Sequence, residues 1–91
     1  MIRSDVIVLG AGIAGASAAA ELAAHARVTL LEMEAQPGYH ATGRSAAYFA
    51  AAYGKRVVRE LTRCCEAFFR APPDGFSELQ LLRPRDCMFF G

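Results

Sequence analysis

The sequence predicts an α/β fold that begins with a strand, a helix and a second strand, and three observations support this. Val6–Leu9 and Val28–Leu31 are short apolar runs with β-branched residues, a pattern typical of strands covered on both faces, as in a parallel sheet. The stretch from residue 13 to about residue 25 is rich in alanine and favours a helix. A glycine-rich turn joins the first strand to this helix. We therefore expect two parallel strands joined by a right-handed crossover.

The turn at residues 10–15 reads Gly-Ala-Gly-Ile-Ala-Gly and matches the pattern G-x-G-x-x-G. Gly10 permits the tight turn, Gly12 lets the backbone approach a diphosphate, and Gly15 lets the helix pack closely on the strand. The free N–H groups and the dipole at the start of the helix favour an anion. Because a predicted strand precedes the motif and a helix and a strand follow it, the motif indicates a dinucleotide site.

Glu32 stands at the end of the second predicted strand, 20 residues after Gly12 (32 − 12). A carboxylate at about this distance accepts hydrogen bonds from the adenosine ribose of a dinucleotide and disfavours a 2′-phosphate. The alternative is an ordinary strand-helix-strand unit in which Glu32 is only solvated. NAD and FAD share the ADP half, so residues 1–32 do not separate these two cofactors.

The segment that follows separates them. An NAD domain usually continues into another crossover helix and a third parallel strand, whereas here a Gln-Pro-Gly turn at residues 36–38 opens a long polar loop. Residues 32–47, E-M-E-A-Q-P-G-Y-H-A-T-G-R-S-A-A, resemble the FAD-dependent amino-acid oxidoreductases of the D-amino-acid oxidase type, and within that family most closely the D-arginine dehydrogenase branch. The likeness runs from Met1 to about Pro84. It implies a Rossmann-like FAD-binding βαβ unit with FAD as the cofactor.

The resemblance also implies which residues hold the cofactor, with residues 41–48 wrapped against the flavin. The candidate cofactor-binding residues are Gly10, Ala11, Gly12, Ile13, Ala14, Gly15, Glu32, Met33, Ala41, Thr42, Gly43, Arg44, Ser45, Ala46 and Ala47. Arg44 would place a positive charge near the diphosphate or the flavin, and Ser45 can donate a hydrogen bond. Ala46 and Ala47 are small enough for the backbone to lie close to a flat ring. The alternative for Arg44 is a solvated surface arginine.

Two tyrosines beyond this loop, Tyr48 and Tyr53, are the candidate substrate-binding residues, because the resemblance implies a lid over the substrate there. Tyr53 matches the family, and its phenol can hydrogen-bond a substrate carboxylate or close the pocket. The sequence departs from the D-arginine dehydrogenase branch at Tyr48, where that branch has a histidine, so the substrate side chain stays open. The alternative for each tyrosine is a partly buried aromatic with its hydroxyl in water.

The second half of the sequence predicts further elements. Residues 55–70 form an amphipathic pattern of about 15 residues, and we expect its apolar stripe to pack in a core. Two short apolar runs, residues 79–83 and 87–90, predict a hairpin or two sequential strands. A doubly wound sheet of roughly six strands needs more chain than this. We therefore expect a fragment truncated before the rest of the doubly wound domain and the substrate domain, with residues 1–75 in the FAD-binding domain and residues 76–91 starting the substrate domain.

The composition excludes several classes of protein. A net charge of +1 and 54% hydrophobic residues give neither the basic excess of a nucleic-acid binder nor the acidity of a disordered tail. The longest apolar stretch, residues 6–31, is interrupted by charged residues and is not a membrane span. No secretory signal is recognisable, so the expected location is cytoplasmic. The three cysteines, Cys64, Cys65 and Cys87, have no C-x-x-C spacing, so we expect free thiols and no metal site.

Together these observations predict an FAD-dependent oxidoreductase that oxidises a D-amino acid, or a related amine, to an imine by hydride transfer to flavin N5. Its partner is a small-molecule substrate, and the electron acceptor stays open. No catalytic residue is identified within the 91 residues, which we do not expect to be active alone. Three alternatives are an NAD-dependent enzyme, a non-catalytic dinucleotide-binding module, and another flavin amine oxidase acting, for example, on sarcosine or glycine.

Overall fold

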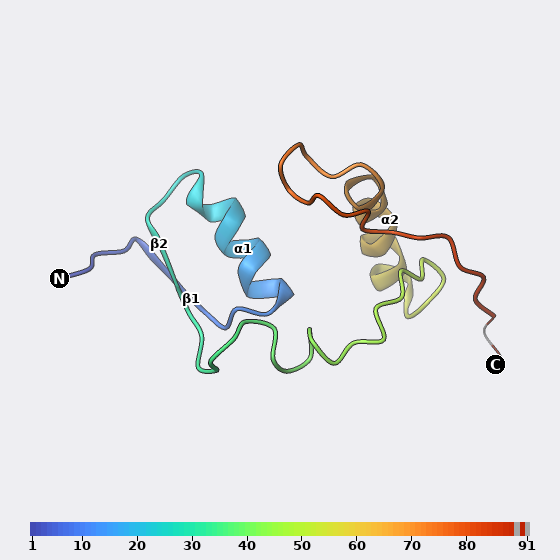
Figure 1. The fold of residues 1–91 in the computed structure, drawn as a ribbon, viewed down its shortest axis with the longest axis horizontal. Helices are drawn as coiled ribbons and strands as arrows, with labels where there is room; N and C mark the ends of the chain where they lie inside the picture. The colour runs from blue at the N-terminus through green and yellow to red at the C-terminus, as the bar shows by residue number, and fades with distance from the viewer. Residues whose placement is uncertain (89, 91) are drawn as a thin grey trace. The chain divides into compact units, whose positions relative to one another are not determined.

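The computed structural model describes residues 1–88 and residue 90, and the chain divides into two compact units, Met1–Ala46 and Ala47–Gly91 (Figure 1). The elements in chain order are β1 (Val6–Leu9), α1 (Ile13–Ala23), β2 (Val28–Leu31) and α2 (Arg56–Arg70). The first three belong to the first unit, and α2 belongs to the second. Neither helix in the described part of the chain has the length and apolar character needed to cross a membrane.

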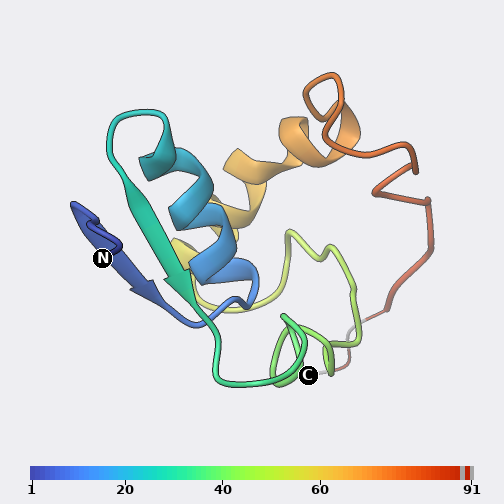
Figure 2. The ribbon, with the colours of Figure 1, turned by 60° about the vertical axis from the view of Figure 1, so that its left-hand side comes forward.

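The first unit is the predicted strand-helix-strand unit. β1 and β2 are parallel neighbours in register, from Val6 opposite Val28 to Leu9 opposite Leu31. α1 packs on one face of these strands, as two views of the ribbon show (Figures 1 and 2). Both strands and the parallel pairing are confirmed, and α1 ends at Ala23, within two residues of the predicted end.

One face of the two-stranded sheet is covered and the other is open. Val8 faces α1, since a Cβ on Gly15 of that helix would lie 3.5 Å from Val8 Cγ1. Ile7 and Leu9 alternate with it and are 61% and 79% exposed. The prediction that β1 is covered on both faces is therefore wrong within this unit, because successive side chains of a strand point to opposite faces and a single helix covers one. Ala19 of α1 is the one buried apolar residue in the part of the chain that the structure describes.

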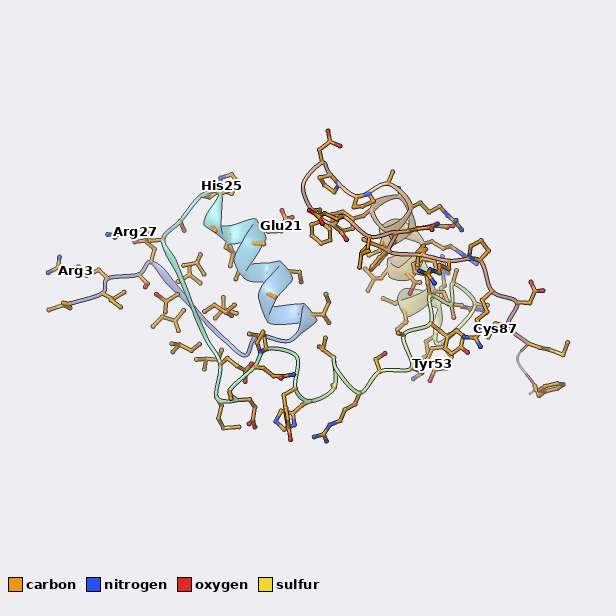
Figure 3. The ribbon with its side chains drawn as sticks, viewed as in Figure 1. Arg3, Glu21, His25, Arg27, Tyr53 and Cys87 are labelled. Carbon is orange, nitrogen blue, oxygen red and sulfur yellow. The ribbon has the colours of Figure 1, made fainter. Side chains whose placement is uncertain are left out.

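An ion pair ties together the amino-terminal ends of the two strands. Asp5 Oδ2 accepts hydrogen bonds from the backbone N (2.9 Å) and Nε (3.1 Å) of Arg27, and Oδ1 accepts one from Nη2 at 2.9 Å. These side-chain and backbone hydrogen bonds from Arg27 hold the pKa of the Asp5 carboxyl below its ordinary value. The hydroxyls of Ser4 and Thr29 also meet between the strands. Arg27 lies where the chain enters β2 (Figure 3).

The second unit contains the predicted amphipathic helix, α2, which is confirmed at Arg56–Arg70. Phe69 is half-buried, with its ring 5.7 Å from that of Phe49. Val57 and Leu61 are 67% and 62% exposed, so core packing of the whole apolar stripe is a wrong prediction for the amino-terminal half of α2. The reason is that the described residues of this unit provide no second helix or strand for that half to pack against.

The strands predicted at residues 79–83 and 87–90 are absent from the described residues of these ranges, which omit Phe89. Pro84 separates the two runs and lacks a backbone N–H, so it cannot donate to a strand pairing. A two-stranded hairpin is at best marginally stable without a further strand or helix beneath it. The division into domains at residue 75 stays a prediction.

Candidate functional site

The candidate site lies at the carboxyl ends of β1 and β2, which are side by side because the strands are parallel. Gly10 follows β1 directly, and its N–H donates to Leu31 O at 2.7 Å, which continues the strand pairing by one bond. Gly10 has a φ of +97°, a left-handed conformation that favours glycine. The tight turn predicted at Gly10 is therefore confirmed.

Close approach requires glycine at position 15 and makes position 12 tight for any larger residue. A Cβ on Gly15 would lie 1.8 Å from the carbonyl oxygen of Gly10, so α1 can start against the turn only if this residue has no side chain. A Cβ on Gly12 would lie 3.0 Å from Thr42 Oγ1. The spacing of the glycines thus leaves the backbone of residues 10–15 open at the start of the helix. We call this segment the cradle.

Glu32, the first residue after β2, places its carboxylate at this cradle. Oε2 accepts a hydrogen bond from Ala11 N at 2.7 Å, and Oε1 accepts one from Glu34 N at 2.9 Å. The backbone N–H of Glu34, followed by that of Ala11, lowers the pKa of the Glu32 carboxyl. The carboxylate is therefore charged and fixed in place, and its remaining lone pairs can accept hydrogen bonds from two ribose hydroxyls.

The loop after β2 returns to the start of α1 (Figures 1 and 2). Gly38 N donates to Ala11 O at 3.1 Å, and Ile13 N donates to Thr42 Oγ1 at 2.9 Å. Gly12, the N-cap residue, has no side chain to cap the helix, and Thr42 supplies the oxygen from 29 residues away. Sequence analysis missed this cap, because no local pattern links residues so far apart.

The residues present fit the ADP part of a dinucleotide. The first four N–H groups of a helix have no partner within it, and here Ile13 N is capped while the amides of Gly12, Ala14 and Gly15 have no protein acceptor among residues 1–88 and 90. These donors and the positive end of the helix dipole suit a diphosphate. Glu32 beside them suits a ribose.

Arg44 lies on the outer surface of the loop. Its guanidinium carbon is 5.3 Å from the centre of the Tyr39 ring, a cation–π distance, and His40 meets that ring edge-on at 5.1 Å. His40 Nε2 is also 2.8 Å from Glu34 Oε1. These contacts shape the loop itself, and the approach of Arg44 to a diphosphate or flavin stays a prediction.

The remaining candidates are exposed. Met33 is 87% exposed beside Glu32. The other loop candidates are exposed: Ala41, Gly43, Ser45, Ala46 and Ala47. Tyr48 and Tyr53 belong to the second unit, where they are 54% and 67% exposed (Figure 3 labels Tyr53). The guanidinium carbon of Arg85 lies 5.5 Å from the centre of the Tyr48 ring, a contact that sequence analysis missed.

A comparison with models of protein families decides the family. The model described as FAD dependent oxidoreductase (DAO) matches residues 5–85, nearly the whole chain. The chain belongs to this family. The cofactor of the DAO family is FAD, so the NAD alternative is set aside. The match covers the strand-helix-strand unit, the loop and α2 of this DAO family protein.

Proposed function

We propose that this DAO family protein oxidises a D-amino acid, or a related amine, to an imine. Membership of an FAD-dependent oxidoreductase family supports redox chemistry on a small molecule. The observation that carries the cofactor part is the Glu32 carboxylate, 2.7 Å from Ala11 N at the start of α1. The choice of a D-amino acid is supported by the resemblance of residues 32–47 to the D-amino-acid oxidase type.

FAD, when bound, would accept at N5 the hydride that leaves the substrate Cα, while the amino group loses a proton, and water then hydrolyses the imine to a keto acid and ammonia. The residues of the first unit serve to bind and orient. Glu32 would hold the ribose, and the amides of Gly12, Ala14 and Gly15 would hold the diphosphate. These contacts would anchor the ADP end of the cofactor.

The contact between Tyr48 and Arg85 supports a preference among substrate side chains. If Tyr48 covers the substrate as the resemblance implies, the guanidinium on its ring places a permanent positive charge close by. A positive charge attracts a carboxylate and repels a cationic side chain. We therefore propose that neutral D-amino acids are better substrates than D-arginine.

The test is the spectrum of the complete gene product. The purified protein should be yellow, and under anaerobic conditions the flavin absorbance should bleach on addition of D-alanine or D-methionine, more slowly with D-arginine, and not with the L-enantiomers. Bleaching with sarcosine or glycine alone would favour another flavin amine oxidase. A yellow protein that no amine bleaches would favour a non-catalytic FAD-binding module, and either result would overturn the proposed substrate.

A further inference from the structure

Four arginines of α2 lie along one side of the helix. At 3.6 residues per turn they fall within an arc of about 60° and extend over about 21 Å of its length. We call them the arginine row: Arg56, Arg59, Arg63 and Arg70. All four are exposed. The exposed apolar residues Val57 and Leu61 lie on the opposite side of α2.

The arginines at the two ends of the row have carboxylate neighbours, which bind them weakly. Arg56 Nε lies 3.0 Å from Glu60 Oε1, and Arg70 Nε lies 2.8 Å from Glu66 Oε1. Both arginine side chains stay more than half exposed, at 84% and 63%, and ion pairs in water contribute little. Each contact uses Nε, so the terminal nitrogens of both guanidinium groups remain donors.

Arg59 and Arg63, in the middle of the row, have no carboxylate partner in the described part of the chain. They are four residues apart, so their charges lie next to each other on the helix and repel. Residues 55–70 contain five basic and two acidic residues, a net charge of +3 (5 − 2). The whole chain carries +1, so the rest of it carries −2 (1 − 3). The positive charge is therefore concentrated on α2, where an external anionic surface would remove the repulsion.

We propose that the arginine row docks on a membrane that contains anionic phospholipids, with α2 lying along the bilayer surface and its apolar stripe turned away. Clusters of four or more basic residues bind anionic headgroups through charge, without a shaped pocket. A protein partner would need apolar or aromatic anchors at the centre of the interface, and the arc of the arginine row contains none. The proposal depends on the charge of α2 and is independent of the proposed substrate.

The experiment measures sedimentation of the complete gene product with lipid vesicles at low salt. We expect binding to vesicles of equal parts phosphatidylglycerol and phosphatidylcholine, and none to vesicles of phosphatidylcholine alone. About 0.5 M NaCl, which screens charges beyond a few ångströms, should release the protein. Arg59→Gln combined with Arg63→Gln should weaken binding by about tenfold or more. Substitution of the same two residues by lysine, which keeps the charge, should retain binding.

The matched control removes two exposed arginines outside α2. Arg3→Gln combined with Arg83→Gln makes the same change in net charge and should bind anionic vesicles like the unmodified protein. All variants should keep their helix content by circular dichroism and their flavin absorbance, because none of these residues belongs to the cradle. Failure of the proposed substrate would appear as a flavin that no amine bleaches, with vesicle binding unchanged.

Several results would overturn the proposal. Absence of sedimentation with anionic vesicles at low salt would mean that the arginine row is only solvated, and equal weakening in the control would mean that net charge alone decides. Equal binding to both kinds of vesicle, or loss of binding in Leu61→Gln but not in the arginine variant, would mean that the apolar stripe contacts the lipid. Tighter binding to duplex DNA or to polyglutamate than to anionic vesicles, at the same salt, would indicate a nucleic acid or a protein as the partner.

Discussion

Gly15 shows how a single atom decides whether the cofactor cradle exists. A Cβ at this position would lie 1.8 Å from the carbonyl oxygen of Gly10, far inside any allowed contact, and the atom it meets is backbone. Gly15→Ala must therefore shift α1 away from the turn. We expect a loss of about 1–3 kcal/mol in the free energy of unfolding and loss of FAD binding, measured by urea unfolding and by flavin fluorescence.

The control for this substitution is Gly75→Ala. Gly75 also has a positive φ, +80°, but nothing lies within 4 Å of its missing Cβ. Alanine there should cost about 1–2 kcal/mol in backbone strain and should leave FAD affinity unchanged. Equal loss of FAD binding in both variants would contradict the specific role of Gly15.

At the scale of the elements, the ion pair between Asp5 and Arg27 adds to the pairing of β1 with β2 at their amino-terminal ends. The pKa of Asp5 is lowered in the folded protein, so its stabilising effect is fully present above the ordinary value of 3.8 and is lost as the pH falls through the lower, folded pKa. Asp5→Asn should therefore flatten the fall in melting temperature below pH 4, measured by circular dichroism. Glu60→Gln removes an exposed pair with Arg56 inside α2 and should leave that fall unchanged. The same profile in Asp5→Asn as in the unmodified protein would contradict the prediction.

The elements also show which parts of the fold the sequence could predict. β1, α1, β2 and α2 were predictable because each depends on a local period of apolar residues, and Gly10 and Glu32 because a strand end fixes their place. The strands predicted within residues 79–90 failed, because pairing depends on partners elsewhere in space and not on the run itself. Thr42 as a cap and Arg85 on Tyr48 could not be found, since each contact joins residues about 30 or more positions apart with no pattern between them.

At the scale of the whole molecule, the core is small, so we expect cofactor binding to contribute much of the stability of the folded state against unfolding. Ala19 is the one buried apolar residue of the described chain, whereas FAD would satisfy the donors before α1 and the lone pairs of Glu32. A ligand that binds only the folded state stabilises it by mass action, by about 2.7 kcal/mol at 100 times its Kd. We therefore expect FAD to raise the melting temperature of the apoprotein of the complete gene product by several degrees, and riboflavin, which lacks the ADP half, to have little effect.

Two substitutions locate this effect at the ribose contact. Glu32→Gln puts an amide NH₂ next to the N–H of either Ala11 or Glu34, so that two donors face each other. It also removes the negative charge that would accept hydrogen bonds from the ribose hydroxyls. The rise in melting temperature caused by FAD should therefore largely disappear. Glu34→Gln alters the neighbouring acid, whose carboxylate pairs with His40 and not with the glycine turn, and should retain the shift. If riboflavin stabilised the protein as much as FAD does, or if Glu32→Gln kept the full shift, the cofactor would be anchored by its flavin end, and the carboxylate after β2 would serve only to close the turn.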